Sequence, residues 1–432
     1  MRLSIRLIRY NKGMILFHNI SQLITLDGGP QRGLTLGKLG LIEQGAIVCE
    51  GETILAVGGE AEMLERFPLA DRVDLRGRAV VPGFVDPHTH LIWAGNRAGE
   101  FEMRLQGKSY MEIMAAGGGI LATLTATRKA SLEQLVEEAR VRADVAFAYG
   151  TTTIEAKTGY GLDIETELRQ LEAILELDRT APIDTVPTYM GAHAIPPEYK
   201  GNTAGYTRFL CEEALPVTKQ WWLEHASDRP LPFVDVFCEA GVFEIAETRE
   251  ILSVAKALGF PLKLHADEFE NLGGASLAAD LGAVSADHLV KTSLEDIQRL
   301  ASSETIAVSL PGTPFGLAQR EYTPAKEILA ADGYLALATD LNPGTTWNES
   351  MQFIQALACR YLKLTPAQAL AASTINAAKA VALEHKVGSI KAGKQADFLV
   401  LTTSDYRNLS YRYGTNQVAL VVKKGELYPN AG

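Results

Sequence analysis

Cysteine is scarce in this chain, and its few cysteines are widely separated. They are Cys49, Cys211, Cys238 and Cys359, with no Cys-x-x-Cys pair among them. Such isolated thiols exclude a disulfide framework and a zinc ribbon, because both need cysteines at short, repeated spacings. A reducing cytoplasm is therefore the expected compartment.

Long apolar runs and basic clusters are also lacking. No run approaches the roughly 20 residues of a membrane-spanning helix. The formal net charge of -11 is spread along the chain, and no Lys/Arg cluster alternates with aromatic residues. These absences argue against membrane and nucleic acid partners and leave a small molecule as the expected ligand.

The first 13 residues have no clear place in a fold. They carry three arginines and a lysine but neither an uninterrupted apolar core nor a small-residue cleavage site, so they are not a secretory signal. Met14, which precedes an apolar stretch, could equally be the natural start. Residues 1–13 are treated as an N-terminal extension of uncertain status.

What the sequence does contain is a series of alternating elements. Hydrophobic residues make up 47% of the 432, enough for a large core. Amphipathic helical stretches separate eight short apolar runs, which is typical of repeated βα units and predicts an α/β fold of the (β/α)8 TIM-barrel type. The runs lead into His88-Thr89-His90, Thr153-Ile154-Glu155, Pro187-Thr188-Tyr189, Val236-Phe237-Cys238, Lys263-Leu264-His265, Ser285-Ala286-Asp287, Val308-Ser309-Leu310 and Leu337-Ala338-Thr339.

The two ends of the chain are predicted to share a second unit. Residues 14–79 and 382–432 contain short strand patterns joined by glycine-bearing turns, and isolated hairpins are marginal in water. We therefore expect one small β-sandwich-like module built from both segments, beside a catalytic barrel over 80–381. Thr365 to Ala380 is predicted to be one barrel-closing helix, and 196–229 is expected to carry an inserted helix.

Histidines gather where a barrel would place its chemistry. The chain has only eight, and His88 and His90 follow the first run, while His265 and His288 end the fifth and sixth. Catalytic groups of such barrels lie at the carboxyl ends of strands. Residues two apart in an extended segment point to the same side, so His88 and His90 can bind one cation; a pair of structural histidines is the alternative.

Two more residues complete a candidate metal site. His265 and Asp340 end the fifth and eighth runs and would give a mixed nitrogen and oxygen shell suited to zinc or iron. Asp340 could instead cap a helix. Glu268 is the candidate acid/base near the metal, and His288 could hydrogen-bond the attacking water or the developing oxyanion. A salt bridge for Glu268 and core packing for His288 are the alternatives.

Lys157 bears on the number of metals. Some binuclear hydrolases bridge two ions with a carboxylated lysine from the fourth strand, but this lysine follows the second run and the fourth ends in Glu239. One metal ion per chain, divalent or trivalent, is therefore expected. Lys157 is left with a structural or anion-binding role.

Taken together in order, the motifs carry more information than any one of them. The motifs are Pro87-His88-Thr89-His90, Ala94-Gly95-Asn96-Arg97, Lys157-Thr158-Gly159-Tyr160-Gly161-Leu162, Gly191-Ala192-His193, His265-Ala266-Asp267-Glu268 and Thr339-Asp340-Leu341-Asn342-Pro343-Gly344. As an ordered set they resemble the imidazolonepropionase family, in the amidohydrolase superfamily, over the chain from about Met14 onward.

The resemblance implies an activity and a set of site residues. The reaction would be hydrolysis of the cyclic amide of 4-imidazolone-5-propanoate to N-formimino-L-glutamate, in histidine degradation, by attack of a metal-activated water. The metal ligands implied are His88, His90, His265 and Asp340. The substrate-binding positions implied are Arg97, Tyr110, Tyr160, His193, Glu268, Asn342, Gly344 and Thr345.

The chemistry of these residues fits the substrate. A propanoate carboxylate is well bound by a guanidinium flanked by tyrosine hydroxyls, which Arg97, Tyr110 and Tyr160 provide, although Arg97 could instead pair with Glu100 or Glu102. His193 could donate to the ring carbonyl. The competing functions are a cyclic deaminase, which would release ammonia, and a metal-binding scaffold without catalysis. A homodimer is the expected assembly.

Overall fold

The computed structural model describes residues 13–108, 112 and 118–430 and contains two sheets. The larger is an eight-stranded, wholly parallel sheet in the order β12-β11-β10-β9-β8-β7-β6-β5. Its strands are β5 (Phe84–Asp86), β6 (Thr151–Lys157), β7 (Asp184–Ala192), β8 (Phe233–Cys238), β9 (Lys263–Ala266), β10 (Ser285–His288), β11 (Ile306–Ser309) and β12 (Leu335–Leu337). This confirms the predicted barrel.

Burial explains why these segments form strands. All seven residues of β6 are buried, and β9, β10 and β11 are buried throughout. Parallel strands covered on both faces are usually rich in apolar and β-branched residues. Here β6, β9 and β10 also carry buried polar residues, among them Glu155, His265 and Asp287. Helices cover the outside and the main apolar core lies between them and the sheet.

The first and last barrel strands meet just beyond their carboxyl ends. The His90 N–H donates to the Leu341 carbonyl at 2.9 Å, and the Asp340 N–H donates to the His88 carbonyl at 3.1 Å. The buried Asp86 carboxylate accepts from the Thr339 N–H at 3.1 Å and from its hydroxyl at 2.5 Å. The segment of His88 and His90 is therefore held directly against the segment of Asp340.

The crossover helices begin at recognisable caps. Ser131 caps α5 and Asp163 caps α6 by accepting backbone N–H bonds. Between β5 and the end of the barrel the helices are α2 (Ala98–Leu105), α4 (Ile120–Lys129), α5 (Leu132–Ala148), α6 (Ile164–Thr180), α7 (Thr203–Phe209), α8 (Leu215–His225), α9 (Ile245–Ala257), α10 (Gly274–Leu281), α11 (Leu294–Ala301), α12 (Gly312–Gly316), α13 (Ala325–Ala330), α14 (Met351–Leu357), α15 (Pro366–Ala372) and α16 (Ile375–Lys379).

Two connections refine the sequence-based prediction. Residues 196–229 carry helical structure, α7 and α8 joined by a π-helical turn over Leu210–Ala214. The single helix predicted over Thr365 to Ala380 is wrong: it is two helices, α15 and α16, because Thr374 has the non-helical angles φ -131° and ψ -91°. Thr365 still begins α15, with a capping box formed with Gln368.

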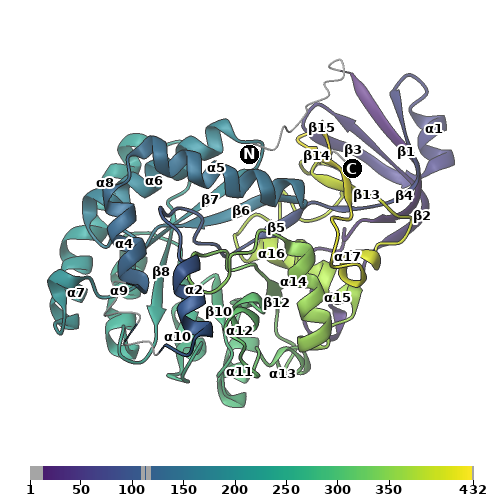
Figure 1. Cartoon of the computed structure of the whole chain (residues 1–432). Coiled ribbons are helices and arrows are strands. Elements are labelled where there is room, and N and C mark those ends of the chain that lie inside the picture. Colours follow the sequence, from purple (N-terminus) through teal and green to yellow (C-terminus); the bar gives the residue numbers. More distant parts are fainter. Residues whose placement is uncertain (1–12, 109–111, 113–117, 431–432) are drawn as a thin grey trace.

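The second sheet joins the two ends of the chain, as predicted. Seven strands lie in the order β15-β14-β13-β4-β1-β2-β3, so the C-terminal strands pair with β4 (Figure 1). The strands are β1 (Met14–Ile24), β2 (Leu41–Glu50), β3 (Thr53–Gly59), β4 (Asp71–Pro82), β13 (Phe398–Leu401), β14 (Val418–Lys423) and β15 (Glu426–Pro429), and the short helices α1 (Glu60–Arg66) and α17 (Asn408–Tyr411) accompany them.

One apolar run belongs to a different sheet from the one expected. Val80, Val81 and Pro82 fall within the barrel limits predicted from the sequence, 80–381, but they end β4 and pair with β13. The chain enters the barrel only at Phe84. Gly83 lies between β4 and β5, where the chain passes from one sheet to the other. A Cβ on Gly83 would lie 2.3 Å from the Thr152 hydroxyl oxygen, so no larger residue fits. Among the described residues, no helix is long and apolar enough to cross a membrane.

Candidate metal centre and active site

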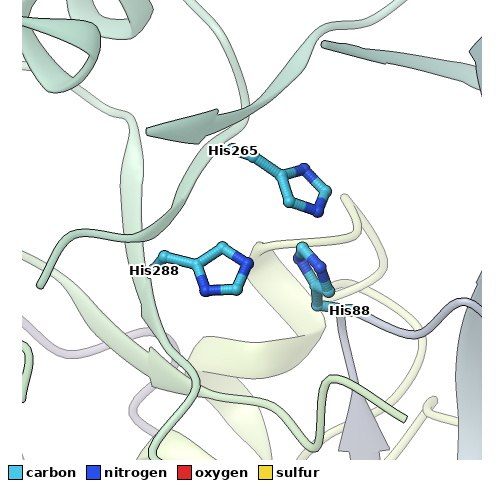
Figure 2. Close-up of side chains that lie close together, drawn as sticks. All are labelled: His88, His265 and His288. Atoms are coloured by element: carbon cyan, nitrogen blue, oxygen red, sulfur yellow. The ribbon is translucent and has the colours of Figure 1, made fainter. Parts of the chain in front are cut away.

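Histidines and a carboxylate from different strands converge at one end of the barrel. His88 and His90 follow β5, His265 lies in β9, His288 ends β10, and Asp340 follows β12. Figure 2 shows the rings of His88, His265 and His288 close together. The ring centres of His88 and His265 are 4.4 Å apart. The strand order therefore brings together residues separated by up to about 250 positions in sequence.

The spacing of the donor atoms suits one metal ion. Nε2 of His88 and Nε2 of His90 each lie 3.7 Å from Oδ1 of Asp340, and Nε2 of His265 lies 3.4 Å from Nε2 of His90. Tetrahedral ligands about 2.1 Å from a metal are about 3.4 Å from one another. Donor atoms of His88, His265 and His288 also lie within 4.8 Å of one another.

Hydrogen bonds fix which ring nitrogen of His88 and of His265 faces the candidate metal position. Nδ1 of His88 donates to the Asp287 carboxylate at 2.6 Å, and Nδ1 of His265 donates to Asp235 at 3.1 Å. A ring that carries its single proton on Nδ1 has a lone pair on Nε2. Nε2 of His88 is buried and has no hydrogen-bond partner in the described part of the chain, which is costly for a polar atom unless a metal binds there.

Burial keeps the rings neutral. The pKa values of His88, His90 and His288 lie well below the ordinary histidine value, first because burial disfavours the charged ring and then because neighbouring charges add to that effect. A neutral imidazole is the form that binds a metal. Burial also raises the pKa of Asp340 to about 6.

Glu268 stands beside this cluster. It is 8% exposed and lines the cavity, and its Oε2 lies 3.7 Å from Nε2 of His288. Burial, followed by the charge of Asp340, raises the pKa of Glu268 well above the usual range for a carboxyl. An acid with a raised pKa next to a candidate metal site is suited to exchanging protons with a substrate.

The predicted residues surround one cavity of about 570 Å³. Of the candidates in the described part of the chain, only His88 does not line it; Tyr110 lies outside the described residues. Those that line it are His90, Arg97, Tyr160, His193, His265, Glu268, His288, Asp340, Asn342, Gly344 and Thr345.

Arg97 reaches the cavity while paired with a carboxylate. Its Nε donates to Glu100 at 2.9 Å and its Nη2 contacts the other carboxylate oxygen, so the ion pair named as its alternative role is present. Gly344 makes room for this guanidinium: a Cβ there would lie 2.6 Å from Nη1 of Arg97. The pair forms part of the cavity wall.

The loop after β12 is shaped by one side chain. Oδ1 of Asn342 accepts from the N–H groups of Gly344 and Thr345, both at 2.8 Å, and its amide donates to the Thr345 hydroxyl at 2.9 Å. Asn342 thus holds the loop in an asparagine turn. Across the cavity, His193 stacks on His90 with ring centres 4.7 Å apart.

Several residues at the site escaped the sequence analysis. Arg104 and Lys108 line the cavity, and Nη2 of Arg104 donates to the Gly344 carbonyl at 3.0 Å. Arg104 lies seven residues after Arg97, a helical spacing that could have revealed it. Asp235 and Asp287 were missed because each is identified only by the histidine that it contacts across the barrel.

Comparison with known proteins places the chain among hydrolases. Models described as amidohydrolase family match residues 71–120 and 238–428. A solved adenosine deaminase from Xanthomonas campestris with bound zinc shares the fold, with a TM-score of 0.69 at 18% identity over 95% of this chain and 92% of that one. The fold and site define a metal-dependent hydrolase of the amidohydrolase class, and the family and the His/Asp cluster together indicate a divalent metal.

Closer relatives specify the family. The imidazolonepropionase of Herpetosiphon aurantiacus is 50% identical over 412 residues, 95% of this chain and 96% of the relative. That of Symbiobacterium thermophilum is 48% identical over 421 residues, 97% and 98% of the two chains. The chain belongs to the imidazolonepropionase family, which confirms the resemblance in its motifs.

Proposed function

We propose that the chain hydrolyses 4-imidazolone-5-propanoate to N-formimino-L-glutamate with one zinc or iron ion bound by His88, His90, His265 and Asp340. The observation that carries the metal site is the buried Nε2 of His88, which has no hydrogen-bond partner among the described residues and lies 3.7 Å from Oδ1 of Asp340. When bound, the metal supplies Lewis acidity and lowers the pKa of a ligand water.

Glu268 manages the proton in this proposal. Hydrolysis adds water across the ring C–N bond, so the carbonyl carbon gains a hydroxyl and the departing ring nitrogen gains a proton. Ionised Glu268 accepts the proton of the attacking water, and its acid form, favoured by burial, gives it to the nitrogen. His288, 3.7 Å from Glu268, hydrogen-bonds the carbonyl oxygen as charge develops there.

Arg97 and the residues around it orient the substrate. The guanidinium of Arg97, with Tyr160 and Tyr110, binds the propanoate carboxylate, and the loop of Asn342, Gly344 and Thr345 closes one side. This role requires the carboxylate to share Arg97 with Glu100 or displace it. The cationic side chains of Arg104 and Lys108, which line the same cavity, favour an anionic substrate.

His193 plays a different part from the one expected. Its Nδ1 donates to the Gly159 carbonyl at 2.9 Å, and burial lowers its pKa to about 3. The neutral ring therefore offers an acceptor, not a donor, on Nε2. We assign it to the N–H of the substrate ring instead of to the ring carbonyl.

The deciding experiment is an assay of purified, metal-quantified protein with freshly made 4-imidazolone-5-propanoate. The expected result is loss of ring absorbance without ammonia, abolished by a chelator and restored by Zn²⁺ or Fe²⁺; comparing the two metals in the restored enzyme assigns the ion. Ammonia release would instead establish a deaminase. No turnover by protein holding one metal per chain would refute the proposed substrate.

A cytoplasmic homodimer completes the proposal. The four cysteines are free thiols, three of them buried, as in proteins of reducing compartments. Light scattering on a size-exclusion column would test the assembly, since a monomer of 46.8 kDa is readily distinguished from its dimer. A monomer at micromolar concentration would refute the dimer.

A further inference from the structure

Lys157, at the end of β6, is the centre of a buried ionic cluster. Its side chain is fully buried, and its Nζ donates to Glu155 at 2.6 Å and to Asp235 at 2.7 Å. No external anion can reach a charge in this position, so the anion-binding role suggested by the sequence is not available to it. The ammonium is instead shared between two protein carboxylates.

Both carboxylates also accept hydrogen bonds from the segments that carry the candidate metal ligands. The other oxygen of Asp235 accepts from Nδ1 of His265 at 3.1 Å and from its backbone N–H at 3.2 Å. The other oxygen of Glu155 accepts from the backbone N–H of Thr89 at 3.0 Å. Thr89 lies between His88 and His90, and its hydroxyl donates to the Glu155 carbonyl at 2.5 Å.

We propose that Lys157 is a positioning residue that sets the affinity of the site for its metal. By holding Asp235 and Glu155 at once, it fixes the tautomer of His265 and the backbone between His88 and His90, which together are three of the four proposed ligands. The inference rests on the proposed function, since it takes these histidines as metal ligands. Groups that orient metal ligands in this way commonly change metal affinity 10- to 100-fold when replaced.

The other buried lysine near the site lacks this arrangement. Nζ of Lys263 donates to the carbonyls of Pro87 at 2.9 Å and Ala380 at 3.2 Å, and lies 3.9 Å from Asp287, beyond hydrogen-bonding distance. Asp287 therefore holds His88 without a direct lysine hydrogen bond. Lys263 therefore bonds the carbonyl before His88, whereas Lys157 bonds the two carboxylates that hold His265 and Thr89.

The test is Zn²⁺ affinity of the metal-free full chain, measured by competition with a chromophoric chelator. Lys157→Met is expected to weaken Zn²⁺ binding by about 10- to 100-fold. The matched control is Lys423→Met. Lys423 is also a buried lysine between two carboxylates, Asp397 at 2.6 Å and Asp184 at 2.8 Å, but it belongs to the small sheet. Its replacement is expected to lower Tm and leave Zn²⁺ affinity unchanged.

Lys157→Met leaves two buried carboxylates without a cation and so risks misfolding. The double variant Lys157→Met/Glu155→Gln avoids this, because it keeps the net charge of the cluster at -1, and Glu155→Gln alone is its control. The double variant is expected to lose Zn²⁺ affinity relative to Glu155→Gln. A histidine-selective ¹⁵N spectrum of metal-free protein should show Nδ1 of His265 protonated in the wild type and mixed tautomers in the variant.

The outcomes distinguish failure of the role of Lys157 from failure of the proposed metal site. Folded variants lacking Lys157 that bind Zn²⁺ within threefold of their controls would overturn the role of Lys157 and leave the metal site standing. Failure of the wild type to bind Zn²⁺, or wild-type affinity in His265→Asn, would overturn the proposed metal site and this inference with it. Weakened binding only when Lys157 is replaced supports the inference.

Discussion

At the scale of single residues, burial decides what the ionisable groups of the site can do. Desolvation disfavours a charge whatever its sign, so it raises the pKa of Glu268 and lowers that of His288. The two groups lie 3.7 Å apart, and burial favours the neutral form of each. A carboxyl that holds its proton more tightly in this way is suited to passing the proton it has accepted to the departing nitrogen.

Glu268→Gln tests the proton-transfer role. The amide keeps the size of the side chain but cannot accept and return a proton, so kcat should fall by about 10²- to 10⁴-fold while bound metal stays at one ion per chain. Steady-state kinetics with metal analysis measures both. The control is Glu270→Gln, a nearby exposed carboxylate. A Glu268→Gln enzyme with near-normal kcat would refute the role.

Arg97→Lys tests recognition of the carboxylate. Lysine keeps the charge but loses the planar pair of donors, so kcat/KM should fall by about 10- to 100-fold, mainly through KM. The matched comparison uses a substrate analogue without the propanoate group, for which the variant and the wild type should be equally poor. An equal loss with both compounds would mean that Arg97 supports the cavity wall without binding the carboxylate.

At the scale of elements, the ends of the strands carry backbone conformations that position the site. His288 and Asp340 have φ values of 77° and 54°, in the left-handed region that residues other than glycine seldom adopt. His288 is the last residue of β10, Asp340 lies three residues after β12, and both side chains line the cavity. Such strain is commonly found where side-chain direction matters for function.

Gly159→Ala tests the loop after β6. Gly159 has φ 107°, and a Cβ would lie 2.9 Å from the Met190 carbonyl and 3.0 Å from Nδ1 of His193. Displacing His193 should lower kcat/KM on the order of 10- to 100-fold while the circular dichroism spectrum stays unchanged. Gly393→Ala is the control, since it has φ 87° but open space around it. Equal kinetics in the two variants would contradict the positioning of His193 by this loop.

At the scale of the whole molecule, the small sheet and the barrel are joined by charges as well as by the chain. Asp184, which begins β7, accepts from Nζ of Lys423 at 2.8 Å, and Lys424 lies 2.7 Å away; both lysines come from the C-terminal part of the chain. Burial alone would raise the pKa of Asp184, but the two lysines lower it below the ordinary value. The ionised form therefore stabilises the folded protein.

Asp184→Asn tests this connection. At pH 7 the variant should lose about 1.5 to 3 kcal/mol of unfolding free energy, typical of a hydrogen bond to a charged group. Because the pKa is lowered on folding, this difference is full above the ordinary aspartate pKa of about 4 and shrinks as the pH falls toward the folded value. Urea unfolding from pH 7 to pH 3 measures it.

The control for this variant is Asp405→Asn. Asp405 pairs with the exposed Arg407 two residues away, and such surface pairs contribute about 0 to 1 kcal/mol. Two results would contradict the stabilising role of the Asp184 pair. One is a loss of unfolding free energy in Asp184→Asn as small as that in Asp405→Asn, and the other is a loss that grows on acidification.

The sequence by itself determined the class of fold and the family. Buried parallel strands are rich in apolar residues and alternate with helices, so the pattern shows in the linear chain. All eight predicted strand ends lie in one sheet or directly after it. The histidines and Asp340 were found for the same reason, since parallel strands bring their carboxyl ends together. Their roles as ligands remain a prediction.

The tertiary structure alone decided which groups support that site. Asp235 and Asp287 are ordinary buried aspartates in sequence, and they are connected to His265 and His88 only through contacts across the barrel. The acceptor role of His193 follows from its hydrogen bond to the Gly159 carbonyl. The break between α15 and α16 follows from the φ and ψ angles of Thr374. The periodicity of a sequence indicates which residues are buried. Contacts between residues far apart in the chain depend on three-dimensional packing, so the spacing of residues in the sequence does not predict them.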